Sequence, residues 1–163
     1  MNYSGIIYDD VANGPGIRTS LFVSGCRRHC KGCFNQEAQD FNYGNEFTTD
    51  IEYQIIKSMD KYHQGITILG GEPLEPENAF TLFLFLEKFK MICPDKDIWI
   101  YTGNTIEEIL TFDKNDYRLK LAMSADVIVD GPFVEELRDI SLKFRGSSNQ
   151  RIICIEKIKN NGD

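Results

Sequence analysis

The residues best suited to chemistry are three cysteines, Cys26, Cys30 and Cys33, which follow one another with the spacing C-x3-C-x2-C. A loop of this length can wrap its three sulfurs around one small inorganic centre. The four irons of a cubane [4Fe–4S] cluster are normally all held by cysteine thiolates. A loop with three thiols therefore predicts either a distant fourth cysteine or a cluster that keeps one iron open for a substrate.

A closed zinc site is another use of such a loop, but it needs four ligands, commonly arranged as two pairs. His29 lies inside the x3 segment, where the loop would have to fold back on itself to supply the fourth ligand. Cys93 and Cys154 stand alone, and we expect both to act as small buried hydrophobic residues. The simplest interpretation is a cluster with three cysteine ligands and one open iron. An open iron can chelate an amine and a carboxylate, and S-adenosylmethionine has both groups beside a reducible sulfonium.

A glycine turn, Gly70-Gly71-Glu72-Pro73, follows a predicted strand over residues 66–69 and suits the same ligand. Two glycines allow the backbone to approach a ligand closely. A ligand ammonium needs acceptors, which strand-end carbonyls and Glu72 provide. An ordinary glycine turn is the alternative. Thr102 and Asp130 are single polar residues at other strand ends, where they can bind a ligand or cap a helix.

The elements that must position these residues alternate along the chain. Strands are predicted over 3–8, 18–23, 66–69, 98–101, 126–129 and 151–155, and helices over 49–63, 77–91, 106–112 and, more weakly, 115–122. Alternation of this kind predicts βαβ units and a mostly parallel sheet. Ligands bind such sheets beyond the carboxyl ends of the strands. We therefore expect the cysteine loop, Gly70–Glu72, Tyr101–Gly103 and Asp130–Gly131 to meet at one rim.

Length and composition restrict the class of protein. A chain of 163 residues with a hydrophobic fraction of 42% predicts a single globular domain over 1–163. The formal net charge of −7 argues against a nucleic-acid partner. No apolar run approaches the ~20 residues that span a bilayer, and no targeting signal opens the chain, so we expect a cytoplasmic protein without a membrane partner.

Four basic side chains lie in or near the cysteine loop of this acidic protein: Arg18, Arg27, Arg28 and Lys31. A basic patch favours docking of an acidic partner, because charge complementarity steers encounter. The sequence therefore suggests an acidic electron donor such as a flavodoxin. The alternative is a solvated loop.

Several motifs resemble known families. The C-x3-C-x2-C loop with Gly-Gly-Glu-Pro resembles the radical S-adenosylmethionine superfamily, and the segment Asn-Gly-Pro-Gly-Ile-Arg-Thr over 13–19 resembles activases of glycyl radical enzymes. Three further segments, over 97–103, 129–133 and 144–150, resemble the activating proteins of anaerobic ribonucleotide reductases. The last of these contains Arg-Gly-Ser-Ser-Asn-Gln and makes the resemblance specific.

The resemblance implies an incomplete, splayed (β/α) barrel of the radical SAM type, open at the side to a large protein. It implies that an electron from a [4Fe–4S] cluster cleaves S-adenosylmethionine to methionine and a 5′-deoxyadenosyl radical. That radical would take hydrogen from a glycine of the large subunit of an anaerobic ribonucleoside-triphosphate reductase. Reduced flavodoxin or a similar protein would supply the electron.

The resemblance also implies roles for particular residues. The cluster ligands would be Cys26, Cys30 and Cys33. The remaining contacts to the cofactor would come from Gly32, Cys33 and Phe34 at the adenine, Gly70, Gly71 and Glu72 at the methionine end, and Thr102 and Asp130 along the rest of the rim. Many superfamily members carry an aromatic residue directly before the third cysteine, whereas here that position is Gly32 and the aromatic is Phe34.

Two other functions compete with this one. The first is a minimal radical enzyme that modifies a small molecule such as a deazapurine without a protein partner. The second is a non-catalytic iron–sulfur electron carrier, which would need a full shell of four cysteines. The carrier leaves Gly70-Gly71-Glu72 without a function.

Overall fold

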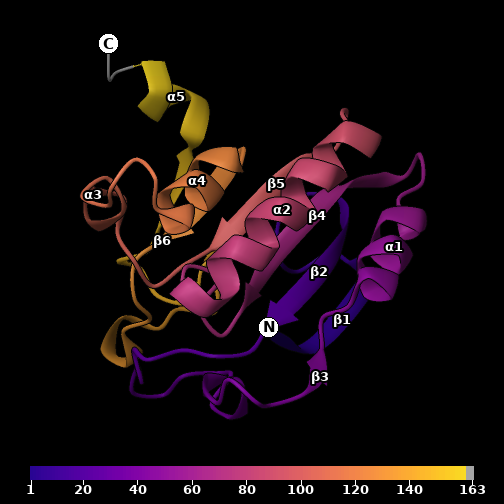
Figure 1. Cartoon of the computed structure of the whole chain (residues 1–163). Coiled ribbons are helices and arrows are strands. Elements are labelled where there is room, and N and C mark those ends of the chain that lie inside the picture. Colours follow the sequence, from indigo (N-terminus) through magenta and orange to yellow (C-terminus); the bar gives the residue numbers. More distant parts are fainter. Residues whose placement is uncertain (161–163) are drawn as a thin grey trace.

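Seven strands form one mixed sheet in the computed structural model, which describes residues 1–160 (Figure 1). In chain order the strands are β1 (Asn2–Asp10), β2 (Ile17–Val23), β3 (Asn45–Glu46), β4 (His63–Gly70), β5 (Asp97–Tyr101), β6 (Val127–Asp130) and β7 (Arg151–Cys154). Their order in the sheet is β3-β1-β2-β4-β5-β6-β7. The sheet is open, with β3 at one edge and β7 at the other.

The parallel part of the sheet is its centre. Strands β2, β4, β5 and β6 pair in parallel, as the alternation of elements predicts. The remaining pairs, β1 with β2, β1 with β3 and β6 with β7, are antiparallel. Because β1 and β2 are consecutive and joined by a short turn, they form a hairpin, which requires the antiparallel arrangement. The four parallel strands bring their carboxyl ends to one rim.

Within the described range, residues 1–160, five α-helices accompany the sheet: α1 (Thr49–Ser58), α2 (Pro76–Ile92), α3 (Ile106–Ile109), α4 (Tyr117–Ser124) and α5 (Ile155–Asn160). Two short 3₁₀ helices cover Glu37–Gln39 and Glu135–Leu137. Helix α2 lies across one face of β4 and β5, between α1 and α4 (Figure 1). Among the described residues, none of the helices has the length and apolar character needed to cross a bilayer.

The core lies between this helical layer and the sheet. Alternate residues of the central strands, Ile66, Ile68, Ile98 and Ile100, are fully buried with the apolar face of α2. Successive side chains of a strand point to opposite faces. The residues next to these isoleucines therefore face the other side of the sheet. Two of them, Leu69 after Ile68 and Tyr101 after Ile100, line the cavity described below.

Several predicted boundaries were wrong, among them that of the helix predicted over 106–112, which ends at Ile109. The helix predicted over 49–63 ends at Ser58, and residues from His63 onward belong to β4. The Asp60 carboxylate accepts hydrogen bonds from the backbone N–H groups of Tyr62 (2.8 Å) and His63 (3.2 Å), a local turn that competes with the helix. The predicted last strand also ends one residue early, because Ile155 begins α5, which was not predicted.

Candidate functional site

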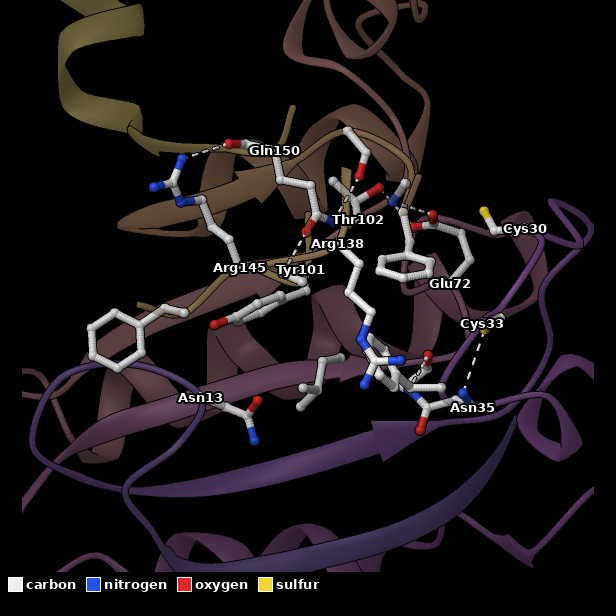
Figure 2. Close-up of a pocket in the computed structure, with 18 of the residues that line it drawn as sticks. Asn13, Cys30, Cys33, Asn35, Glu72, Tyr101, Thr102, Arg138, Arg145 and Gln150 are labelled. Atoms are coloured by element: carbon white, nitrogen blue, oxygen red, sulfur yellow. Dashed lines mark hydrogen bonds between the residues drawn. The ribbon is translucent and has the colours of Figure 1, made fainter. Parts of the chain in front are cut away.

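A cavity of about 560 Å³ lies at the rim formed by the strand ends (Figure 2). This volume is within the usual range for small-molecule sites. All four segments expected at the rim contribute to its wall, through Cys30 and Cys33, Gly70–Glu72, Tyr101–Gly103 and Gly131. The convergence inferred from parallel strand topology is therefore confirmed.

Seven of the ten residues predicted for the site line this cavity: Cys30, Cys33, Phe34, Gly70, Gly71, Glu72 and Thr102. The other three, Cys26, Gly32 and Asp130, do not. Figure 2 shows Cys30, Cys33, Glu72 and Thr102 towards one side of the cavity and Tyr101 and Arg145 towards the other. The cavity thus has a cysteine side and an opposite side.

The cysteine loop is closed at its base by backbone hydrogen bonds. The N–H of Gly25 donates to the carbonyl of Ala38 (2.7 Å), and the N–H of Cys26 donates to the carbonyl of Gln39 (3.0 Å). Within the loop, the N–H of Cys33 donates to the carbonyl of Cys30 (3.2 Å). These bonds return the chain to its starting point and hold all three cysteines within one closed loop.

The donor chemistry of this loop fits an iron–sulfur cluster. Three free thiols, Cys26, Cys30 and Cys33, are all partly exposed. Cys93 is buried in the core as predicted, whereas the prediction of burial was wrong for Cys154, which is partly exposed in β7 but does not line the cavity. Burial raises the pKa of the Cys26 thiol, and the nearby carboxylates of Glu72 and Glu75 raise it further. Within residues 1–160, no three Cys, His, Asp or Glu side chains are already gathered in the geometry of a metal site. Two thiols face the cavity and the third lies beside it.

The two glycines of the Gly-Gly-Glu turn are required by its close contact with the cysteine loop. Gly70 has φ +107°, and a Cβ there would lie 2.7 Å from the backbone of Val23. A Cβ on Gly71 would lie 2.7 Å from the carbonyl oxygen of Gly25. The backbone N–H groups of Gly71 and Glu72 donate to the carbonyls of Val23 (2.7 Å) and Gly25 (2.8 Å). The turn therefore joins the end of β4 directly to the base of the loop.

Glu72 is almost completely buried, and the protein itself supplies donors to both of its carboxylate oxygens. Oε1 accepts from the backbone N–H of Leu74 (2.9 Å) and the hydroxyl of Thr102 (2.8 Å), and Oε2 accepts from the N–H of Gly103 (2.8 Å). Burial raises the pKa of this carboxyl, and the three hydrogen bonds oppose the shift. Glu72 thus connects the ends of β4 and β5 at the cavity wall.

Thr102 and Asp130 occupy different positions in this framework. Thr102 lines the cavity, and besides its bond to Glu72 it accepts from the backbone N–H of Asn104 (3.0 Å). Asp130 is fully buried away from the cavity. Its carboxylate accepts from the N–H of Ile106 at the start of α3 (2.8 Å) and from the guanidinium of Arg151 (2.5 Å). Asp130 therefore caps a helix, which was the second of its two predicted uses.

Gly32 and Phe34 lie on either side of the third cysteine, and only Phe34 lines the cavity. Gly32 has φ +71°, a left-handed conformation that disfavours any residue with a side chain, an aromatic one included. Phe34 lines the cavity and is 60% exposed. Its ring packs against Phe133, with centroids 5.0 Å apart, and the guanidinium of Arg138 lies 4.9 Å from its centroid. Phe34 is the aromatic surface nearest the cysteines in the sequence.

Every cation of the predicted basic patch is paired with an acidic side chain, and Arg18 is buried and not part of a surface. Each of its four cations is within 4 Å of an acid: Arg18 pairs with Asp97, Arg27 with Glu75 and Glu77, Arg28 with Glu72 and Glu108, and Lys31 with Glu135 and Glu136. Counting charges along the sequence cannot reveal these pairs, because the acidic partners are distant in the chain. The positive charge near the loop is therefore largely compensated.

Arg18 holds the Asn-Gly-Pro-Gly turn against the sheet. Its side chain is fully buried and donates to the hydroxyl of Thr67 (2.8 Å) and to the carboxylate of Asp97 (2.5 Å). The Thr67 hydroxyl in turn donates to the backbone carbonyl of Asn13 (2.7 Å). A Cβ on Gly14 would lie 2.8 Å from the Arg18 side chain. This network places Asn13 in the cavity wall, a role that the sequence did not indicate.

The Arg-Gly-Ser-Ser-Asn-Gln segment builds the opposite wall. Gln150 accepts from the backbone N–H of Gly146 (2.8 Å) and donates to the carbonyl of Gly131 (3.1 Å). Asn149 donates to the carbonyl of Pro132 (2.8 Å). These side chains fasten the segment to the loop after β6, and Arg145, Gly146 and Gln150 line the cavity. The segment therefore closes one side of the site.

Comparison with known proteins identifies the class first. A family model described as "4Fe-4S single cluster domain" matches residues 12–153, which include the three cysteines of the loop. Among curated relatives, proteins named anaerobic ribonucleoside-triphosphate reductase-activating protein are similar over almost their whole length. The relative from Haemophilus influenzae is 44% identical, covering 93% of this chain and 97% of its own length.

Two more distant sources give the same name. The relative from Escherichia coli (strain K12) is 40% identical over 92% of this chain and 96% of its own length. The relative from Enterobacteria phage T4 is 37% identical over 93% of both chains. The chain therefore belongs to the 4Fe-4S single cluster domain family and, within it, to the anaerobic ribonucleoside-triphosphate reductase-activating proteins.

Proposed function

We propose that this chain is an enzyme that activates an anaerobic ribonucleoside-triphosphate reductase by generating a glycyl radical on its large subunit. The observation that carries the proposal is the closed loop with three free thiols beside the Gly-Gly-Glu turn, at one side of a cavity large enough for a cofactor. The names of the curated relatives support the choice of partner.

The three cysteines of the loop, Cys26, Cys30 and Cys33, are the proposed cluster ligands. When bound, a [4Fe–4S] cluster supplies one electron that breaks the sulfonium C–S bond of S-adenosylmethionine, giving methionine and a 5′-deoxyadenosyl radical. The radical takes a hydrogen atom from the target glycine, so that 5′-deoxyadenosine is released and the unpaired electron remains on the glycine. The electron-carrier alternative needs a fourth cysteine ligand, and the structure does not favour it, because Cys93 belongs to the core and Cys154 does not line the cavity.

The chain's own residues bind and orient the cofactor. Backbone groups of Gly70 and Gly71, brought close by the absence of side chains, and the rim around Glu72 are proposed to receive the methionine end. The backbone around Gly32 and Cys33 and the ring of Phe34 are proposed to flank the adenine. Thr102 is the proposed contact along the remaining rim. Asp130 acts indirectly in this proposal, by fixing the start of α3 behind the rim.

The open sheet suits a protein substrate. We interpret the fold as an incomplete, splayed (β/α) barrel of the radical SAM type, since four parallel strands present their carboxyl ends to the cavity and the sheet does not close. An unclosed sheet leaves the side of the cavity accessible to a segment of a large partner. The electron donor in this proposal is reduced flavodoxin or a similar one-electron protein, and the site of action is the cytoplasm.

An anaerobic assay tests the proposed function. The cluster is reconstituted, a reductant and S-adenosylmethionine are added, and 5′-deoxyadenosine is measured with and without the reductase. We expect 5′-deoxyadenosine in both samples and a glycyl radical signal by EPR only with the reductase. Absence of 5′-deoxyadenosine from a fully reconstituted sample would contradict the proposal, and formation without any radical on the reductase would favour the small-molecule alternative.

A further inference from the structure

The hydroxyl of Tyr101 is an unsatisfied polar group in the cavity wall. Tyr101 is the last residue of β5, and its side chain projects from the strand into the cavity (Figure 2). The hydroxyl oxygen is buried and has no hydrogen-bond partner within the part of the chain that the structure describes. Buried hydroxyls in proteins are nearly always hydrogen-bonded, so an exception needs an explanation. A ligand that enters the cavity would provide one.

The protonation state of this hydroxyl is fixed by its surroundings. Burial raises the pKa of Tyr101, and the positive charge of Arg18 only partly opposes this shift. The group is therefore a neutral O–H donor throughout the physiological range. It suits a neutral acceptor such as a carbonyl oxygen.

A second polar group with a fixed orientation lines the same cavity. The side-chain amide nitrogen of Asn13 donates to the carboxylate of Asp10 (2.6 Å), and Asp10 itself is buried and also accepts from Ser20 (2.5 Å). A carboxylate can only accept, so it fixes which end of the amide faces it. The oxygen Oδ1 of Asn13 is left without a hydrogen-bond partner among residues 1–160, and it is available as an acceptor.

The position of Tyr101 separates it from the proposed cofactor contacts. Figure 2 shows its ring directed away from Cys30, Cys33 and Glu72, towards the part of the cavity bordered by Asn13 and Arg145. The surrounding wall is apolar and includes Leu69, Leu142 and Phe144. Arg145 borders the same part, and its buried Nε also has no partner among the described residues. The wall thus offers two N–H or O–H donors and one carbonyl acceptor, which match the C=O and N–H groups of a peptide segment.

We propose that the Tyr101 hydroxyl donates a hydrogen bond to a main-chain carbonyl of the partner segment that carries the target glycine, with Asn13 Oδ1 available to a main-chain N–H of the same segment. This inference rests on the proposed function and adds the subsite where the protein substrate is held. Tyr101 binds the segment and makes no covalent bond. The hydrogen atom still leaves the glycine.

The substitution Tyr101→Phe tests the proposal, because it removes only the hydroxyl oxygen. Since that oxygen has no partner among residues 1–160, we expect the urea midpoint of the variant to equal or exceed that of the wild type. We expect formation of 5′-deoxyadenosine without the reductase to be unchanged. With the reductase, we expect the concentration that gives half-maximal glycyl radical formation to rise about tenfold, which corresponds to ~1.4 kcal/mol.

Tyr53→Phe is the matched control, because Tyr53 lies on α1, is 64% exposed and does not line the cavity. It should leave all three measurements unchanged. A lower urea midpoint for Tyr101→Phe with an unchanged reductase dependence would show a structural hydroxyl and overturn the proposal. Slower 5′-deoxyadenosine formation without the reductase would instead assign Tyr101 to the cofactor. A wild-type protein that forms no 5′-deoxyadenosine would overturn the proposed function itself.

Discussion

Glu72 and Tyr101 are polar side chains at the ends of neighbouring strands, and both line the same cavity, but their surroundings differ. Glu72, just after β4, receives three hydrogen bonds from Leu74, Thr102 and Gly103. The buried hydroxyl of Tyr101, the last residue of β5, has no hydrogen-bond partner in the described part of the chain. An unpaired buried polar group costs on the order of 1–3 kcal/mol, so the cost is avoided at the Glu72 carboxylate and not at the Tyr101 hydroxyl.

This difference indicates a division of work within the cavity. The cysteine side is fixed by backbone hydrogen bonds, by glycines in close contact and by the buried carboxylate, which together hold the proposed cofactor site in one geometry. The opposite side keeps free hydrogen-bonding capacity and exposed apolar side chains such as Ile140, which is 91% exposed. A site that must accept and release a protein segment requires such capacity.

The largest effect is expected at the cysteine side. Alanine at Cys26, Cys30 or Cys33 removes one of only three proposed cluster ligands, so 5′-deoxyadenosine formation should fall below detection and bound iron should decrease. Iron content and product can be measured on the same reconstituted sample.

Cys154→Ala is the matched control for these three variants, since Cys154 lies in β7 outside the cavity, and it should keep both iron and activity. Equal losses in Cys154→Ala and Cys33→Ala would contradict the assignment of the ligands to the loop.

Arg18→Ala should have the next largest effect, on stability. It removes a fully buried guanidinium that donates to Thr67 and Asp97, and leaves Asp97 only the weaker bond from the Gln64 amide (3.3 Å). Because the Asp97 side chain is 27% exposed and can regain water, we expect the free energy of unfolding to fall by about 3 kcal/mol, at the lower limit for a buried pair. Urea denaturation measures the change.

Arg27→Ala provides the comparison for Arg18→Ala. Arg27 also pairs with two carboxylates, but its side chain is 56% exposed, so its loss should have a much smaller effect. Similar losses for the two variants would show that burial of Arg18 does not matter.

Glu72→Gln tests whether burial raises the pKa of Glu72 despite the three hydrogen bonds that its carboxylate accepts. The pKa of Glu72 is raised above its ordinary value of 4.5, so the folded state holds the proton more strongly than the unfolded state. The contribution of this shift to the free energy of unfolding is fully present below pH 4.5 and is lost as the pH rises through the raised pKa. Below pH 4.5 the wild type should be more stable than the glutamine variant by about 1–2 kcal/mol, because one end of the amide faces the N–H of Gly103.

As the pH rises, this advantage of the wild type over Glu72→Gln should shrink. Thermal unfolding of both proteins at a series of pH values gives the difference directly. An advantage that grows with pH would mean that the three hydrogen bonds outweigh burial and that the pKa of Glu72 is lowered.

Ile140→Ser should have the smallest effect. Because this side chain is exposed on the opposite wall, its replacement should change the free energy of unfolding by less than about 0.5 kcal/mol. A larger loss, measured by urea denaturation, would show that the wall around Ile140 is packed as tightly as the cysteine side.

The sequence predicted the meeting of the strand ends correctly but not the direction of every side chain. Parallel strands bring their carboxyl ends to one rim, which suffices to join the cysteine loop to Gly70–Glu72 and Thr102. Whether a strand-end side chain faces the cavity depends on the phase of the strand, because successive side chains alternate. Asp130 therefore points away from the cavity to Ile106 and Arg151, and Tyr101 points into it.

Burial and pairing of charges were also outside the reach of the sequence. Arg18 reads as part of a basic surface, but its partner Asp97 is 79 residues away in the chain and on a strand two positions along the sheet. The lack of any partner for the Tyr101 hydroxyl is likewise visible only in three dimensions. Sequence motifs located the cysteine side, and the structure was needed to find the side opposite it.

The most direct test of the proposed reaction is transfer of the hydrogen atom itself. A reductase in which glycine is deuterated at Cα is incubated anaerobically with the reconstituted protein, a reductant and S-adenosylmethionine, and 5′-deoxyadenosine is examined by mass spectrometry. We predict that deuterium appears in 5′-deoxyadenosine in proportion to the glycyl radical formed. Unlabelled 5′-deoxyadenosine accompanying a full yield of glycyl radical would contradict direct abstraction from the glycine.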